Sequence, residues 1–326
     1  MQFNSDLDPQ LEDLFIAMEA EHGPSPDPTL LGVAEGRALS EELNRRWNVD
    51  LPEVQIRRDI WLDADEEIGS ARTRLRVLLP ANASPGAVVF VHGGGFAFGG
   101  PEMQDRLSRV LAVESKMPVL VPDYRLAPEN PYPCGLQDVV ACVRHGMKAA
   151  IDLGVKSGPL ILCGESAGAN LGLAAMLNEH LHSMLMPVGA VFFSGNFGLD
   201  TSTPSYEQFA DGPGLTRARM QRFLRWYVGD RDLSSDPLAS PLAASDEMLS
   251  ALPPIHLFAA GIDPLQSDSL MLAERLARLG RPCDLVIVPG VTHAFTQYSA
   301  FLQKTRDVLR SAGSIMRRMA AVPPAR

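Results

Sequence analysis

A serine flanked by two glycines is the first group in the sequence whose setting favours chemistry. The run Gly164-Glu165-Ser166-Ala167-Gly168 follows the apolar stretch Leu160–Cys163 and opens a helix-like stretch, Ala167–Leu181. So tight a turn from strand to helix leaves no room for side chains beside the serine, and the glycines remove them. The hydroxyl of Ser166 would face solvent at a helix N-terminus, where the dipole favours developing negative charge. This context predicts a nucleophile, and the alternative is a plain glycine-rich turn.

A run of three glycines is the second chemical anchor. His92-Gly93-Gly94-Gly95-Phe96 follows the apolar stretch Ala87–Val91, and its exposed backbone N–H groups can bind an oxyanion. The dinucleotide motif G-x-G-x-x-G fails because its sixth position is Phe98, and the chain has no G-x-x-x-x-G-K-[ST] phosphate loop. We expect His92 to hold the glycine loop by hydrogen bonds rather than to act in catalysis.

A nucleophilic serine needs a base, and the base needs an orienting carboxylate. Of the seven histidines, His293 alone follows an apolar β-like run through a short loop, and Asp263 follows another such run in the same way. The resulting order, Ser166 then Asp263 then His293, is the α/β-hydrolase order. Asp268 is the second candidate acid, although it should already lie in the next helix. The alternative for Asp263 is an N-cap of that helix.

Short apolar runs alternate with helix-like stretches and must position these groups. The runs are apolar on both faces, as buried parallel strands are, so the alternation predicts an α/β fold with a mostly parallel sheet. The predicted parallel strands are Ala87–Val91, Val119–Val121, Leu160–Cys163, Val188–Phe193, Ile255–Ala259 and Leu285–Val288. The predicted helices between them are Asp105–Glu114, Gln137–Leu153, Ala167–Leu181 and Ser267–Leu279. Polar and apolar residues alternate in Gln55–Ala64 and Thr73–Leu79, which predicts antiparallel strands at the sheet edge.

Two regions depart from this alternation. Residues 1–50 are helix-like and precede every strand, and residues 196–252 insert a loop-rich stretch with one helix, Thr216–Val228. An insertion at the carboxyl end of a strand lies where α/β sheets bind ligands. We therefore expect a helical cap from residues 1–50 and 196–238, over an α/β catalytic domain from residues 51–195 and 239–326.

Composition excludes several classes of partner. The chain has 29 Lys and Arg against 39 Asp and Glu, a net charge of −10, which argues against nucleic acids and anionic membrane surfaces. No uninterrupted apolar window has the length of a membrane span, and the first residues are acidic where a secretory leader is basic, so we expect a cytoplasmic protein. The adjacent pair His180 and His182 cannot share a helix face, and no metal or organic cofactor is expected.

Further motifs add a family resemblance. They are Asp123-Tyr124-Arg125-Leu126-Ala127-Pro128-Glu129, Ser240-Pro241-Leu242, Asp263-Pro264-Leu265 and His293-Ala294-Phe295. With the two anchors, they resemble the hormone-sensitive-lipase-like branch of the α/β-hydrolases, which includes many bacterial carboxylesterases. The resemblance covers roughly residues 50–300. It implies a catalytic triad of Ser166, Asp263 and His293, oxyanion donors from the backbones of Gly94, Gly95 and Ala167, and a helical cap.

The resemblance also has departures and open points. The family commonly continues its aspartate motif as D-P-L-R-D-E, whereas this chain has Gln266-Ser267-Asp268 after the leucine. Glu165 stands where Asp or Thr is common, and we expect it to point back into the fold. The family often dimerises through an edge strand, for which Leu285–Val288 is available. We expect a buried polar network of Asp123, Arg125, Glu129 and Asp138.

The combined expectation is a serine esterase that cleaves small carboxylic esters through an acyl-enzyme. Its apolar pocket would be lined by aromatic residues, although several of these could simply pack the cap: Phe96, Phe98, Phe197, Phe209, Trp226 and Phe295. One alternative uses the same triad for amide or lactam hydrolysis, acyl transfer or elimination on a specialised metabolite. A second alternative is a non-catalytic ligand receptor.

Overall fold

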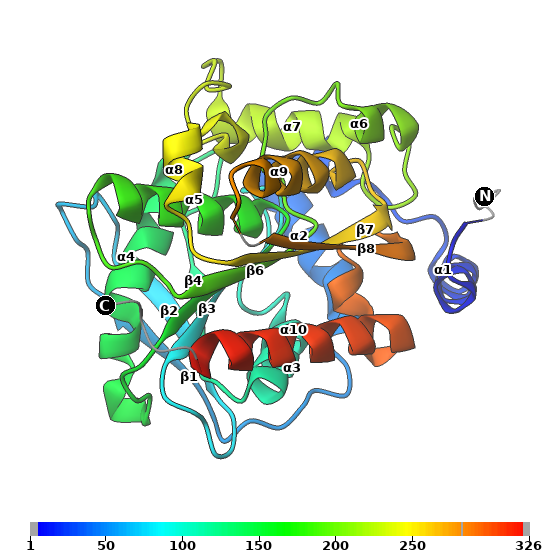
Figure 1. The fold of residues 1–326 in the computed structure, drawn as a ribbon. Coiled ribbons are helices and arrows are strands. Elements are labelled where there is room, and N and C mark those ends of the chain that lie inside the picture. The colour runs from blue at the N-terminus through cyan, green and yellow to red at the C-terminus, as the bar shows by residue number, and fades with distance from the viewer. Residues whose placement is uncertain (1–5, 282, 322–326) are drawn as a thin grey trace.

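A central sheet organises the molecule (Figure 1). The structure is a computed structural model and describes residues 6–281 and 283–321. The described residues form eight strands in the spatial order β1-β2-β4-β3-β5-β6-β7-β8. Strand β2 is antiparallel to both of its neighbours, and the remaining pairs are parallel. The strands are β1 (Ile56–Leu62), β2 (Thr73–Leu79), β3 (Ala87–Val91), β4 (Val119–Asp123), β5 (Leu160–Glu165), β6 (Gly189–Phe193), β7 (Ile255–Ile262) and β8 (Cys283–Thr292). The predicted mostly parallel sheet with two antiparallel edge strands is confirmed.

Helices cover both faces of this sheet (Figure 1). Helices α3 (Asp105–Ser115) and α10 (Gln303–Ala321) lie on one face. The other face carries α4 (Cys134–Ala149), α5 (Ala167–Leu181) and α9 (Gln266–Arg278), with the short α8 (Asp246–Ser250) beside α5. Strand side chains alternate between the two resulting cores. This two-sided burial explains why the predicted strands were apolar throughout.

Alternation is clearest on β3. Val89 and Val91 join the core beneath α4 and α5, whereas Val88 and Phe90 join the core beneath α3 and α10. All four side chains are fully buried.

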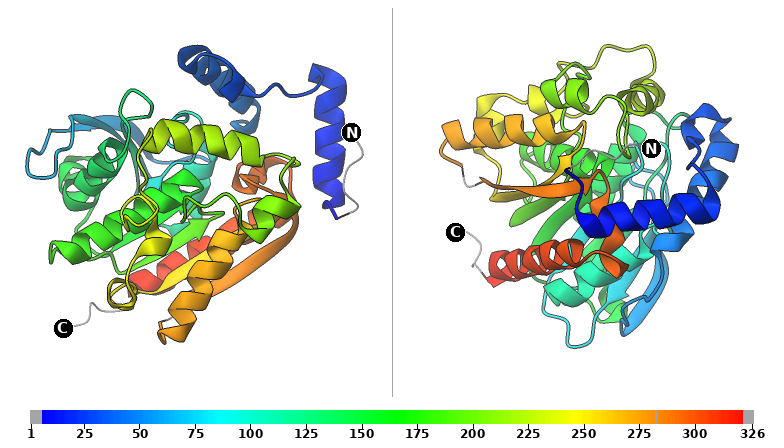
Figure 2. Two further views of the ribbon diagram at one scale, coloured as in Figure 1. Left: turned by 90° about the horizontal axis from the view of Figure 1, so that it is seen from above. Right: turned by 90° about the vertical axis from the view of Figure 1, so that its right-hand side faces the viewer.

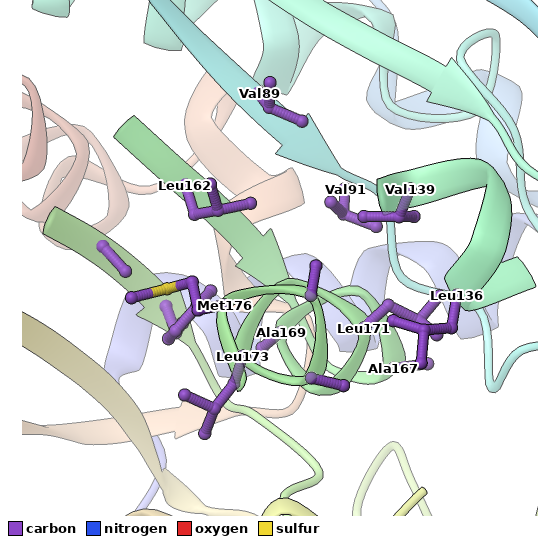
Figure 3. Packing of buried hydrophobic residues seen from close by; sticks show 14 of the residues in the cluster. Val89, Val91, Leu136, Val139, Leu162, Ala167, Ala169, Leu171, Leu173 and Met176 are labelled. Carbon is purple, nitrogen blue, oxygen red and sulfur yellow. The ribbon is translucent and has the colours of Figure 1, made fainter. Parts of the chain in front are cut away.

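Helix α5 packs directly against the sheet (Figure 3). Its apolar side chains, including Leu171, Leu173 and Met176, pack in the same core as Val89 and Val91. At its first turn the backbones nearly touch, because a Cβ added at Gly168 would lie 2.1 Å from the carbonyl oxygen of Val91. Only glycine fits at this position, so the sequence allows the helix to begin directly against β3.

The segments before β1 and after β6 lie outside the helical layers (Figure 2). They contain α1 (Pro9–His22), η1 (Pro28–Leu30), α2 (Val33–Asn44) and η2 (Arg45–Trp47), and then α6 (Pro204–Gln208) and α7 (Arg217–Val228). One carboxylate ties the two segments together: Asp27 pairs with Arg219 at 3.1 Å and also with Arg222. Among the described residues, no helix has the length and apolarity needed to cross a membrane.

Arg37 joins the first segment to the loops above the sheet. Its guanidinium donates to the carbonyls of Ala97 and Ala127, both at 2.8 Å, and pairs with Glu129 at 2.6 Å. Arg37 therefore fixes α2 against the chain that follows the glycine loop.

The expected single network of buried acidic and basic groups is wrong. Arg125 pairs with Asp138 at 2.9 Å, but Asp123 pairs with Arg74 and Glu129 pairs with Arg37. The four residues fall into separate ion pairs because two of the arginines come from distant segments of the chain.

We predict that Gly168→Ala lowers the free energy of unfolding by about 1–3 kcal/mol, since the added methyl group meets rigid backbone atoms. Gly32→Ala is the control, because no atom lies within 4 Å of a Cβ added there. Gly32 is the N-cap of α2, where alanine is less favourable than glycine, so this change should cost at most about 1 kcal/mol. Thermal and urea unfolding measure both variants. Equal stability of the two variants would contradict the close approach of α5 to β3.

Candidate active site

Ser166 sits on the turn between β5 and α5. Its backbone has φ 55° and ψ −121°, a conformation that costs a non-glycine residue about 1–3 kcal/mol. The flanking glycines permit it, because a Cβ added at Gly164 would lie 2.5 Å from the carbonyl oxygen of Gly168. The Ser166 N–H donates to the Phe193 carbonyl of β6 at 3.0 Å, which holds the turn at the carboxyl edge of the sheet. The predicted strained turn is therefore present.

Strand register brings Asp263 and His293 together. Ile262 of β7 pairs with Thr292 of β8, so the residues that follow them emerge side by side. His293 Nδ1 lies 2.8 Å from Asp263 Oδ2, and His293 Nε2 lies 2.9 Å from Ser166 Oγ. Because a carboxylate only accepts hydrogen bonds, Nδ1 carries the proton and Nε2 accepts from the serine hydroxyl. This is the arrangement in which the histidine can take the serine proton.

Opposing effects set the pKa of His293. Burial lowers it, but the charge of Asp263, the hydrogen bond to Asp263 and the charge of Glu165 together raise the pKa above its ordinary value of 6.5. Arg219 acts in the opposite direction. A protonated His293 would thus be stabilised mainly by Asp263.

The glycine loop lies beside the serine because Val91 of β3 pairs with Gly164 of β5. Gly94 has φ 125°, and a Cβ added there would lie 2.1 Å from the carbonyl oxygen of Phe98. Gly95 has φ 60°, and a Cβ added there would lie 2.2 Å from the ring of Phe223. Both N–H groups are without an acceptor among residues 6–281 and 283–321. The Ala167 N–H, at the first position of α5, has no acceptor within the helix. These three groups were the predicted oxyanion donors.

A buried carboxyl braces the loops from behind. Glu165 accepts from Gln104 Nε2 at 2.6 Å and from the hydroxyl of Thr296, and Gln104 Oε1 accepts from the Gly93 N–H at 3.4 Å. Burial raises the pKa of Glu165, while Thr296, His293 and Gln104 act to lower it. The side chain thus points into the fold, as expected, and links the glycine loop, the elbow and the segment after His293.

His92 also has the expected supporting position. Its Nδ1–H donates to the Gly93 carbonyl at 2.8 Å, and its ring stacks on Tyr124 with centroids 4.2 Å apart. Tyr124 in turn donates to the His92 carbonyl at 3.0 Å. Burial lowers the pKa of His92, which keeps the ring neutral.

Asp268 lies in α9, as predicted, and makes no contact with His293 that competes with Asp263. Its Oδ2 accepts the N–H groups of Phe197 at 2.8 Å and Gly198 at 2.9 Å. Burial raises its pKa to about 7, although the two N–H groups lower it. Asp268 therefore holds the chain after β6 rather than orienting the histidine.

One cavity, with a volume of about 280 Å³, contains Ser166 and His293. Both outer segments line it, the first through residues such as Met18 and Leu43 and the second through residues such as Leu215 and Met220. Of the six aromatic residues expected in the pocket, the structure places Phe98 alone in this lining.

The other five pack elsewhere, because large rings gain most where they are fully enclosed. Phe96 stacks on Tyr227, and Trp226 packs against Phe98 and Phe223 behind the cavity wall. The remaining three lie in the cores of the sheet: Phe197, Phe209 and Phe295.

Several residues that line the cavity were not predicted from the sequence. Trp47 and Tyr298 contact each other with ring centroids 4.7 Å apart, and Phe223 faces Gly95. Arg46 and Arg219 also line the cavity. Helical spacing groups Arg219 with Phe223 on one face of α7, but nothing local shows that this face meets the serine. In the part of the chain that the structure describes, no three metal-ligating side chains form a cluster.

Comparisons with known proteins agree with this fold. A family model described as an α/β hydrolase fold matches residues 88–297. Esterase LipI of Mycobacterium tuberculosis is 32% identical over 298 residues, which cover 86% of this chain and 91% of that protein. An ester hydrolase from the metagenome of Lake Arreo superposes with a TM-score of 0.87 at 28% identity, covering 96% of this chain and 98% of that one. An esterase from Pyrobaculum calidifontis gives a TM-score of 0.86 at 27% identity, covering 97% and 100%.

The chain therefore belongs to the α/β-hydrolase fold family. Its predicted place in the hormone-sensitive-lipase-like branch is confirmed.

The two buried acids should respond differently to removal of their charge. We predict that Asp263→Asn lowers kcat/KM by up to ~10⁴-fold, because the amide favours the wrong histidine tautomer. Asp268→Asn keeps an oxygen for its two N–H donors and should lose less than about tenfold. Initial rates on one activated ester, with circular dichroism as the folding control, measure both. A larger loss for Asp268→Asn would contradict the assignment.

The raised pKa of His293 predicts a pH dependence. Proton abstraction needs the neutral imidazole, so kcat/KM should fall as pH decreases through that pKa. The midpoint of this acid limb should lie above 6.5, the ordinary histidine value. A rate profile measured over the range in which the far-ultraviolet spectrum is constant tests it, and a midpoint at or below 6.5 would count against the assigned environment.

Proposed function

We propose that the chain is a serine carboxylesterase that cleaves short- to medium-chain carboxylic esters through an acyl-enzyme. One observation carries the proposal: Ser166, His293 and Asp263 are joined by hydrogen bonds of 2.9 and 2.8 Å at the wall of a cavity. The relatives named as esterases support the class of reaction.

Each step follows from an atom of the site. His293 Nε2 takes the proton from Ser166 as Oγ attacks the ester carbonyl, and Asp263 stabilises the imidazolium. The N–H groups of Gly94, Gly95 and Ala167 bind the oxyanion of the tetrahedral intermediate.

Collapse of that intermediate breaks the ester bond. His293 returns its proton to the leaving alcohol, and the acyl group remains on Ser166 Oγ. The same imidazole then activates a water molecule that releases the carboxylic acid and restores the serine.

The cavity supports a limit on substrate size. Its volume of about 280 Å³ lies near the lower end of the range for small-molecule sites. Residues 1–50 and 196–238 act as the cap in this proposal, since both contribute to the lining and the Asp27 ion pairs tie them together. An assembled wall of this kind restricts the acyl chain and gives no reason for activation at a lipid interface.

Other expectations from the sequence stay predictions. They include the cytoplasmic location and a homodimer through β8, where Val286 and Ile287 are exposed. The intact hydrogen bonds among the three site residues disfavour a non-catalytic receptor. Rates on esters paired with matched amides separate ester hydrolysis from amide or lactam hydrolysis.

A series of para-nitrophenyl esters of increasing acyl length tests the proposal. We expect kcat/KM to rise by up to about fourfold per CH₂ while apolar room remains, since each buried CH₂ contributes ~0.8 kcal/mol. The rate should peak at or below about eight carbons, because overfilling costs about 1–3 kcal/mol. Ser166→Ala supplies the background rate. Undiminished hydrolysis of emulsified long-chain triglycerides would overturn the proposal, as would full activity in Ser166→Ala.

A further inference from the structure

The charges that line the cavity are unusual for so acidic a chain. Its net charge is −10, yet the charged side chains of the lining are Arg46, Arg219, Glu165 and His293. Glu165 uses its two oxygens on Gln104 and Thr296, and His293 is committed within the site. The cationic groups that remain to meet a substrate are the two guanidiniums.

Arg219 is only partly neutralised. It donates through Nε to Asp27 Oδ1 at 3.1 Å. Asp27 Oδ2 is bound by Arg222, so one carboxylate is shared between two guanidiniums and the group keeps a net charge of +1. The charge of Arg219 reaches the active centre, since it acts on the pKa of His293.

Arg46 carries a second positive charge. Its guanidinium lies 5.9 Å from the centre of the Trp47 ring, and its side chain is half-buried. Over residues 6–281 and 283–321, it has no hydrogen-bond acceptor and no carboxylate partner. A guanidinium at the cavity wall without an anionic partner is free to bind a carboxylate of the ligand.

We propose that this cavity selects esters that carry a carboxylate away from the scissile bond, bound by Arg219 and Arg46. This substrate class rests on the esterase function proposed above. Planar guanidinium groups bind carboxylates through paired, charge-assisted hydrogen bonds, and a neutral ester leaves them unmatched. A local positive field is also what an anionic substrate needs in order to approach a chain with a net charge of −10.

Two matched substrate pairs test the selection from either side of the ester. Para-acetoxybenzoate and its methyl ester place the carboxylate, or its neutral replacement, in the alcohol part. The mono-para-nitrophenyl ester of adipic acid carries the carboxylate in its acyl part, and para-nitrophenyl hexanoate is its neutral counterpart. For each pair, the readout is the ratio of kcat/KM for the anionic ester to that for the neutral ester, after subtraction of the Ser166→Ala rate.

Arg219→Gln and Arg46→Gln are the test variants. We expect the ratio for at least one pair to fall about tenfold or more in each variant, the effect of losing one charge-assisted hydrogen bond. Arg45→Gln is the matched control, because Arg45 is the exposed neighbour of Arg46 and does not line the cavity. Its ratios should equal those of the unaltered protein. Since both substrates meet the same preparation, a reduced folded fraction cancels from each ratio.

The outcomes separate this proposal from the one on which it rests. A change of less than about threefold in both ratios, for both arginine variants, overturns the carboxylate selection while Ser166-dependent hydrolysis of the neutral esters leaves the esterase in place. An equal fall in Arg45→Gln also overturns it, because the effect would then be one of general surface charge. Failure of the unaltered protein to cleave any of the four esters overturns both proposals.

Discussion

The site depends on one backbone contact, the approach of the first turn of α5 to the end of β3. A Cβ at Gly168 would lie 2.1 Å from the Val91 carbonyl, so the absence of a side chain sets the distance between helix and strand. The chain passes through Ser166 with φ 55°, and α5 begins at the next residue, so the positive end of the helix dipole lies at the serine. Because the glycine run begins two residues after Val91, the same contact places its backbone N–H groups next to Ser166.

Buried polar groups stabilise what that contact assembles. Glu165 costs free energy to bury, as its raised pKa records, but its hydrogen bonds with Gln104 and Thr296 offset this cost. These bonds connect the end of β5 to the segments that follow β3 and β8. The two segments and the strand end are therefore held together around the 2.9 Å contact between His293 and Ser166.

Ion pairs link the segments that line the cavity. Asp27 joins the segment before β1 to α7 through Arg219 and Arg222, so the wall of the cavity is held by ion pairs as well as by apolar contacts. Arg37 fixes α2 to the carbonyls of Ala97 and Ala127, in the loops that follow β3 and β4. Of these arginines, Arg219 also lines the cavity, so one residue that holds the wall in place also brings positive charge to the site.

The sequence alone determined the reactive groups and their order. Two glycines around Ser166, a glycine run after a strand, and strand-end loops before Asp263 and His293 are local signals, because backbone conformation and strand period are encoded by neighbouring residues. Element positions followed from the same periodicity, and several strands proved longer than their apolar runs, as β8 shows. The predictions that differed from the structure concern which side chains contact one another.

Tertiary structure decided the rest, because it depends on which distant segments meet. The pairing of Ile262 with Thr292 brings acid and base together, and no local pattern specifies that register. Distant contacts also decide which aromatic residues line the pocket. Phe197 packs on Phe192 in the core, whereas Trp47 contacts Tyr298, which is far away in the sequence. An aromatic ring gains from burial wherever it is enclosed, so its type alone could not distinguish core from cavity.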